Sequence, residues 1–159
     1  TGAAKVGGNY AASLLPGKMA KSRNFSDVIY LDPSTHTKIE EVGSANFFGI
    51  KNNTYVTPES TSILPSITNK SLMQIAEDLG MKVERRPIPE EELATFEEAG
   101  ACGTAAVISP ISRLDDLEEG KTYNFGEKPG PWSLKLYETL RGIQYGTIED
   151  KHNWTMVVM

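Results

Sequence analysis

The apolar residues between positions 64 and 80 recur at the spacing of one face of an α-helix. They are Ile67, Leu72, Ile75, Ala76 and Leu79. Residues three and four apart lie on the same side of a helix, and a glycine commonly follows its last turn. The pattern therefore predicts an amphipathic helix within 64–80 that stops at Gly80.

Runs of β-branched and aromatic residues predict strands on both sides of this helix. We expect strands at 27–32, in pairs within 38–58 around a turn at "KNNT", at 82–88, and after a turn within 101–111. Further helices are expected at 9–23, at 90–96 and within 128–146. Pro16-Gly17 should kink or interrupt the first of these, and Pro131 should begin the last, which should end near Gly142. Because strands and helices do not alternate regularly, the predicted fold class is α+β, or an irregular α/β.

Composition and charge narrow the class of protein. The chain has 159 residues, of which 39% are hydrophobic and 23% charged, which fits one globular domain. Its net charge of −5 and the lack of a basic stripe argue against nucleic acid as a partner. The densest acidic run, residues 89–100, is interpreted as a solvated helix face.

The chain has one cysteine, Cys102, and therefore no internal disulfide. No apolar run approaches the length of a membrane span, so we expect a cytoplasmic protein without a membrane partner. Cys102 would need a base to act as a nucleophile, and the two histidines, His36 and His152, lie in polar or terminal surroundings. We interpret Cys102 as a small buried residue, and no cluster of metal ligands is expected.

Two stretches could bind an anion through backbone N–H groups, and each also has an ordinary structural explanation. "LPSIT" at 64–68 begins the predicted helix, where free N–H groups and the Thr68 hydroxyl could hold a phosphate. A simple helix cap explains the same residues and is commoner. "GACGTAAV" at 100–107 could expose successive N–H groups beside Thr104, or simply form a tight turn before a buried strand.

Lys5 and the pair Glu40 and Glu41 complete the candidate chemistry. Lys5 stands alone among small residues in "AAKVGG". Successive strand residues point to opposite faces, so one of the two glutamates should face solvent and the other the interior, unless both are only partly covered at an edge. A lysine amine, an interior carboxylate and amide-rich turns are the groups that pyridoxal phosphate requires, for its Schiff base, its ring nitrogen and its phosphate. These features permit such a site without requiring it.

Four stretches in this order resemble the branched-chain amino acid aminotransferases, which are fold-type IV (class IV) pyridoxal-phosphate enzymes. They are "KVGGNYAASL", "EVGSANFF", "ILPSIT" and "EAGACGTAAVISP". The resemblance continues through "GIQYG" at 142–146 to Trp154. It implies a pyridoxal 5'-phosphate cofactor and amino transfer from leucine, isoleucine or valine to 2-oxoglutarate, which gives branched 2-oxo acids and glutamate.

The resemblance also implies roles for single residues around the cofactor ring. Lys5 would bind the cofactor covalently and carry a proton between substrate and cofactor. Tyr10 would donate a hydrogen bond to the phenolic oxygen. Glu41, rather than Glu40, would pair with the pyridinium nitrogen.

The same resemblance implies the groups that bind the phosphate and the substrate. Ile67 and Thr68 would hold the phosphate at the start of the helix. Gly103 and Thr104 would add contacts from the second turn. The backbone amides of Thr104 and Ala105 would lie near the substrate carboxylate.

Members of this family carry a further domain before the lysine, which supplies an arginine to the phosphate and part of the substrate pocket. Since the chain opens with "TGAAKVGG", we expect residues 1–159 to be the C-terminal cofactor-binding domain, without its N-terminal domain. It should be weakly active or inactive alone, and a homodimer in the intact protein. A D-amino acid aminotransferase or an aminodeoxychorismate lyase of the same fold type is one alternative. The other is a catalytically silent fragment that only binds cofactor or dimerises.

Overall fold

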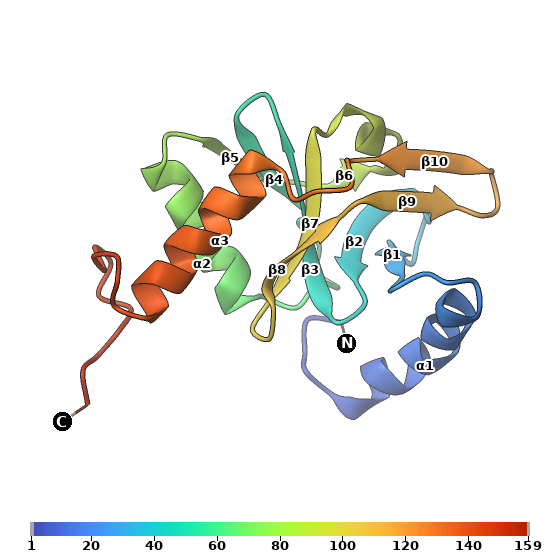
Figure 1. Cartoon of the computed structure of the whole chain (residues 1–159). Coiled ribbons are helices and arrows are strands. Elements are labelled where there is room, and N and C mark those ends of the chain that lie inside the picture. Colours follow the sequence, from blue (N-terminus) through green and yellow to red (C-terminus); the bar gives the residue numbers. More distant parts are fainter. Residues whose placement is uncertain (1, 159) are drawn as a thin grey trace.

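The structure, a computed structural model, describes residues 2–158. In chain order its elements are α1 (Gly7–Ser22), β1 (Ile29–Leu31), β2 (Lys38–Val42), β3 (Ala45–Lys51), β4 (Thr54–Thr57), α2 (Ile67–Asp78), β5 (Lys82–Arg85), β6 (Ile88–Pro89), the 3-10 helix η1 (Glu90–Thr95), β7 (Glu98–Gly103), β8 (Val107–Ile111), β9 (Arg113–Asp116), β10 (Lys121–Asn124) and α3 (Pro131–Gln144). Figure 1 shows α2 and α3 together on one side of the sheet and α1 at the other end. Within 2–158, no helix combines the length and apolar character needed to cross a membrane.

Strand β3 organises the eight-stranded sheet. It pairs with β7 from Asn46 to Ile50, with β2 near its beginning and with β4 near its end. The β3–β4 hairpin turns at Asn52 and Asn53, whose φ angles are +48° and +56°. A two-residue hairpin turn requires positive φ, which asparagine tolerates better than most residues. The predicted strand pairs and their turn are therefore confirmed.

The connection from β4 to β5 passes through α2. These two strands are parallel, with Thr54 opposite Lys82 and Thr57 opposite Arg85. Parallel neighbours need a crossover connection, and α2 provides it. The other strand pairs within residues 2–158 are antiparallel. The fold is thus α+β, as the irregular order of elements predicts.

Alternating residues of β3 point into two cores, one on each face of the sheet. Phe48 belongs to the core that α2 and α3 cover, together with Leu72 and Leu136. Phe47 belongs to the opposite core, with Phe96 after η1 and with part of the β9–β10 hairpin packed against it. Because side chains alternate along a strand, "FF" in the middle of β3 supplies one large apolar side chain to each core.

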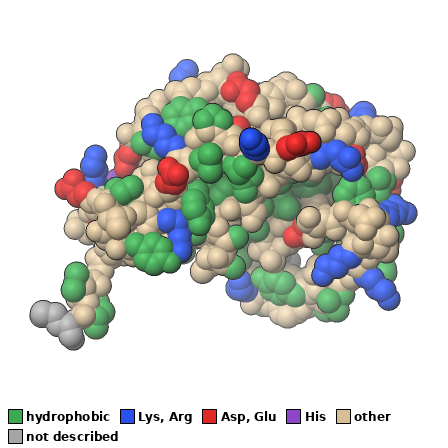
Figure 2. Space-filling view, in the orientation of Figure 1, with side chains coloured by type: hydrophobic (Ala, Val, Ile, Leu, Met, Phe, Trp, Pro, Cys, Tyr) green, Lys and Arg blue, Asp and Glu red, His purple; other side chains and the backbone are tan. Residues whose placement is uncertain are grey.

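Helix α1 runs through Pro16 without a break, so the expected interruption is wrong. A proline removes one helical hydrogen bond, but on an exposed helix water can satisfy the carbonyl that loses its partner. This helix is exposed along most of its length: Leu14 and Leu15 are 74% and 67% accessible, whereas Ala20 is buried. Figure 2 shows apolar side chains on the surface of the lobe where Figure 1 places α1.

The acidic stretch 89–100 is not a solvated helix, which corrects the sequence interpretation. Only η1 is helical, and Glu98 already belongs to β7 and is buried. The Glu98 carboxylate accepts hydrogen bonds from the backbone N–H groups of Trp132 and Ser133 at the beginning of α3. Free N–H groups at a helix N-terminus stabilise a negative charge, which is why this glutamate can be buried.

Strand β7 continues through Gly103, so the stretch "GACG" forms strand rather than turn. The turn consists of residues 104–106, and β8 follows it as an antiparallel partner of β7. Helix α3 begins at Pro131 as predicted and ends at Gln144, two residues beyond the expected end at Gly142. Strand β7 extends beyond its expected limits because its pairing with β3 and β8, rather than its local glycine content, sets its length.

Candidate functional site

Lys5 lies in a compact turn that leads into α1. The carbonyl of Ala4 accepts hydrogen bonds from the backbone N–H of Val6 (3.0 Å) and from the side chain of Asn9 (2.9 Å). The Lys5 side chain is exposed, and its Nζ lies 5.9 Å from the centroid of the Tyr10 ring. Tyr10 is itself 38% accessible. The two residues therefore lie together on an open face of the molecule.

Glu41 is a half-buried carboxylate on β2. It accepts hydrogen bonds from the backbone N–H of Leu64 (3.3 Å) and from the side chain of Asn46 (3.4 Å). Burial raises the pKa of Glu41, and the hydrogen bond from Leu64 only partly opposes this. No lysine, arginine or histidine of residues 2–158 forms an ion pair with it. Glu41 is thus a partly desolvated acceptor to which a cationic group could bind favourably.

Glu40 does not face solvent, which corrects the expectation that one of the two glutamates would. It is 8% accessible, and its carboxylate accepts hydrogen bonds from the hydroxyls of Ser60 (2.6 Å) and Ser62 (3.1 Å). The alternation expected of a regular strand is broken here, because the pairing of β1 with β2 shifts register between Ile39 and Val42, and both of these residues face the same core. Both glutamates therefore meet the loop after β4, Glu40 at Ser60 and Ser62 and Glu41 at Leu64. Glu40 therefore anchors this loop, in which Leu64 donates its backbone N–H to Glu41.

The stretch "LPSIT" forms the N-terminus of α2. Ser66 is the N-cap, and its hydroxyl accepts a hydrogen bond from the backbone N–H of Asn69. The backbone N–H groups of Ile67 and Thr68 lie in the first turn of the helix, where no carbonyl of the helix can accept their hydrogen bonds. They therefore remain available to an anion. Ile67 is 76% accessible, so it does not belong to the apolar face that its spacing suggested. The helix cap is therefore confirmed, and phosphate binding at this helix start stays a prediction.

The turn between β7 and β8 exposes Thr104 and Ala105 directly after the half-buried Gly103. Val107, which follows the turn, has a φ of +63° although it is β-branched. This conformation is strained for such a residue and persists only where the surroundings hold it. Val107 is 3% accessible and pairs with Gly103 across the β7–β8 ladder. The turn is therefore held in one conformation by the strands on both sides of it.

Strand pairing brings Glu41 and this turn to the same end of the sheet. Glu41 pairs with Asn46, and Asn46 pairs with Cys102, two residues before Thr104. The buried side chain of Asn46 also donates a hydrogen bond to the carbonyl of Leu64 (3.1 Å), where the chain approaches α2. Sequence analysis did not single out Asn46, although a lone amide within the apolar run "ANFFGI" was a signal for it.

The segment that carries Lys5 reaches the same region. Gly2 packs against the backbone of Ser62 so closely that a Cβ atom would overlap the Ser62 carbonyl. The chain before α1 therefore crosses the loop that Glu40 and Glu41 hold. In Figure 1 the N-terminus, the β2–β3 and β7–β8 turns and the beginning of α2 all lie along the lower edge of the sheet.

Cys102 is buried at 1% accessibility, as predicted, and burial raises the pKa of its thiol to about 12. Such a thiol is protonated at neutral pH and is a poor nucleophile. Within residues 2–158, no three histidine, cysteine, aspartate or glutamate side chains gather in a way that could hold a metal ion.

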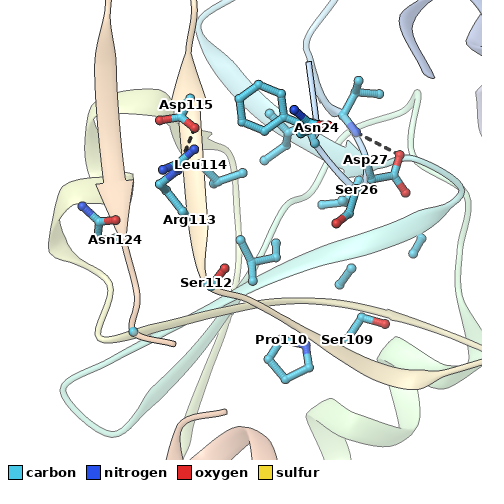
Figure 3. A pocket seen from close by; sticks show the side chains of 18 of the residues that line it. Asn24, Ser26, Asp27, Ser109, Pro110, Ser112, Arg113, Leu114, Asp115 and Asn124 are labelled. Carbon is cyan, nitrogen blue, oxygen red and sulfur yellow. Dashed lines mark hydrogen bonds and ion pairs between the residues drawn. The ribbon is translucent and has the colours of Figure 1, made fainter. Parts of the chain in front are cut away.

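A groove of about 930 Å³ lies between the chain after α1 and strands β8 and β9, and the β2–β3 turn forms part of its wall (Figure 3). Arg113 and Asp115 on its wall form an ion pair of 2.8 Å. Asp27 accepts a hydrogen bond from the backbone N–H of Val28. These three charged side chains already have partners, and none of the predicted site residues lines the groove.

Comparison with known proteins identifies the family to which this chain belongs. The sequence profile of the family described as Amino-transferase class IV matches residues 2–114. The branched-chain-amino-acid aminotransferase of Helicobacter pylori is 54% identical over 99% of this chain and 46% of its own length. The crystal structure of the Escherichia coli branched-chain amino acid aminotransferase superposes with a TM-score of 0.85 at 33% identity, over 97% of this chain and 49% of the other.

A third similar structure is the branched-chain amino acid aminotransferase of Thermobaculum terrenum in its holo form with pyridoxal phosphate. It superposes with a TM-score of 0.81 at 29% identity, over 94% of this chain and 47% of the other. The chain belongs to the class IV amino-transferase family. It spans about half the length of the relatives that it matches.

Proposed function

We propose that these residues form the pyridoxal-phosphate-binding domain of a branched-chain amino acid aminotransferase. The observation that carries this proposal is the convergence of four segments at one edge of the sheet: the turn with Lys5, strand β2 with Glu41, the beginning of α2, and the β7–β8 turn. The branched-chain enzymes at high identity support the same substrates. Bound in such a site, pyridoxal phosphate supplies a conjugated ring that accepts electrons from the reacting carbon of an amino acid.

The chain's own residues fit this cofactor. Glu41 is partly desolvated and lacks a cationic partner within residues 2–158, which suits the protonated nitrogen of a pyridine ring. Lys5 would provide the amine that binds the cofactor and afterwards holds the transferred proton on its Nζ. Tyr10, beside Lys5, would donate its hydroxyl hydrogen to the phenolic oxygen of the ring.

The two anion-binding segments would hold the phosphate and the substrate carboxylate. Available N–H groups at Ile67 and Thr68, with the hydroxyl of Thr68, form one half of the phosphate site. Gly103 and Thr104 form the other half from a turn that is held rigid on both sides. The backbone N–H groups of Thr104 and Ala105, both exposed, would orient the substrate carboxylate.

The substrates that we propose are leucine, isoleucine and valine, with 2-oxoglutarate as amino acceptor. The intact enzyme would be a cytoplasmic homodimer. We also propose that the part of the relatives' length outside these 159 residues completes the substrate pocket, since Lys5 and Tyr10 are open to solvent here.

Borohydride trapping tests the assignment of Lys5. The 159-residue chain is incubated with pyridoxal phosphate, reduced, digested and mapped by mass spectrometry. We expect the label on Lys5, and no label in a Lys5→Ala variant. Lys18 and Lys21 on α1 serve as internal controls because they are exposed lysines close in sequence. A label on either of them that equals the label on Lys5 would refute the assignment.

The two neighbouring glutamates give a matched pair of variants. Glu41→Gln should weaken binding of pyridoxal phosphate, because the ring nitrogen loses its anionic partner, while the unfolding free energy stays nearly unchanged. Glu40→Gln should act through the loop at Ser60 and Ser62, and should lower the unfolding free energy by about 1–2 kcal/mol. Absorbance titration and urea unfolding of both variants separate the two effects. Equal losses of affinity in both would contradict the assignment of Glu41 to the ring.

A further inference from the structure

Tyr55 places its hydroxyl group beneath the first of the two segments proposed to bind phosphate. It lies on β4, is fully buried, and its ring stacks on Phe48 with a centroid distance of 5.0 Å. Its hydroxyl donates a hydrogen bond of 2.8 Å to the side-chain oxygen of Asn69. Asn69 follows Thr68 in the first turn of α2 and is 8% accessible. The first segment is therefore fixed from beneath by a buried polar contact.

Asn69 is held at three points. Its side-chain amide donates to the hydroxyl of Thr57 (3.0 Å), which in turn donates to the carbonyl of Phe47 (2.8 Å). Its backbone N–H donates to Ser66, the N-cap residue. Each side chain of this network has a partner, and a satisfied buried network fixes the position of its members. The first turn of α2 is thereby tied to β3 and β4.

The strand to which this network is tied also positions the second segment. The network ends at the carbonyl of Phe47 on β3, and the neighbouring Asn46 pairs with Cys102 on β7, which belongs to the same core as Tyr55. Cys102 directly precedes Gly103 and Thr104 at the end of β7. Burial raises the pKa of Tyr55 well above its ordinary value, so the hydroxyl stays protonated and remains a hydrogen-bond donor.

We propose that Tyr55, through Asn69, is a positioning residue that fixes the first turn of α2 on β3 and thereby sets the separation of the two phosphate-binding segments. This inference rests on the proposed function. A phosphate can accept hydrogen bonds from both segments at once only when their N–H groups keep a fixed spacing, and a binding site tolerates displacements of only about 0.5 Å. Tyr55 touches neither the phosphate nor the reacting atoms, and acts by holding the groups that do.

The test replaces Tyr55 by phenylalanine, which keeps the ring and its stacking and removes only the hydroxyl. Dissociation constants of the 159-residue chain are measured by absorbance titration for pyridoxal phosphate and for pyridoxal, which lacks the phosphate. We expect Tyr55→Phe to weaken the binding of pyridoxal phosphate about tenfold and the binding of pyridoxal less than about twofold. Asn69→Leu, which removes the partner of the same hydroxyl, should give the same selective loss.

The control is Ile75→Val, a buried change on α2 that loosens the same core away from the phosphate segments. It should leave the ratio of the two affinities unchanged. A loss of affinity that is equal for pyridoxal and pyridoxal phosphate in Tyr55→Phe, or no loss for either, overturns the positioning role. A wild-type chain that binds neither compound overturns the proposed function, and this proposal with it.

Discussion

Replacement of Glu98 by alanine should destabilise the chain by about 3 kcal/mol, because it removes the cap of α3. The Glu98 carboxylate is 6% accessible. It accepts hydrogen bonds from the N–H of Trp132 (3.0 Å) and from the N–H and the hydroxyl of Ser133 (2.8 and 2.7 Å). Ser133 is 1% accessible, so water cannot readily replace the lost acceptor.

The magnitude follows from the groups that the substitution leaves behind. The two buried donors of Ser133 would cost about 1–3 kcal/mol each when unsatisfied. The lost attraction between a carboxylate and a helix N-terminus adds about 0.3–1 kcal/mol. Removal of a buried charge offsets part of this sum, which leaves about 3 kcal/mol. In a chain of this size the melting temperature should fall by about 6–12 °C.

Urea unfolding, followed by circular dichroism, measures this change as a free energy. Glu91→Ala is the control, since Glu91 lies in the same acidic stretch as Glu98 but is exposed. This substitution should change the free energy of unfolding by less than about 0.5 kcal/mol. Glu98→Gln retains one acceptor and should fall between the two. A loss in Glu98→Ala no larger than that in Glu91→Ala would refute the capping argument.

Three further predictions concern reactivity, pH and activity. Because Cys102 is buried and its thiol pKa is raised to about 12, a disulfide reagent should label it only after unfolding, and rapid labelling of the native chain would contradict its burial. The hydrogen bond from Arg86 lowers the pKa of Glu92 to about 2, against burial, which raises it. This contribution to stability is present above the ordinary glutamate pKa of 4.5 and is lost as the pH falls towards 2. In Arg86→Met the free energy of unfolding should therefore depend less steeply on pH in acid than in the wild type, and an unchanged dependence would sink the argument. The 159-residue chain should transaminate leucine at least about a hundredfold more slowly than the full-length Helicobacter pylori relative, because Lys5 is open to solvent, and comparable turnover would show that these residues suffice.

The sequence by itself determined the elements in which local preference and tertiary surroundings agree. The pair Asn52 and Asn53 predicts a hairpin because few other residues adopt positive φ in succession. Ser66 and Gly80 mark the limits of α2, since one caps free N–H groups and the other adopts a φ of +82°. The motifs around Lys5 and Glu41 predicted the residues of the candidate site by resemblance, and the structure adds the contacts that join them.

Only the tertiary structure decided which distant segment packs against each face of a helix or strand. Glu98 and Glu91 belong to one acidic run, but only Glu98 lies where the N-terminus of α3 arrives from elsewhere in the chain. Glu40 is buried because a loop folds over it, and Ile67 is exposed although its spacing matches the buried residues of α2. The β9–β10 hairpin has few apolar residues, so no periodic pattern predicted it. Periodicity specifies which residues share a face, whereas burial and hydrogen bonding depend on segments that are distant along the chain.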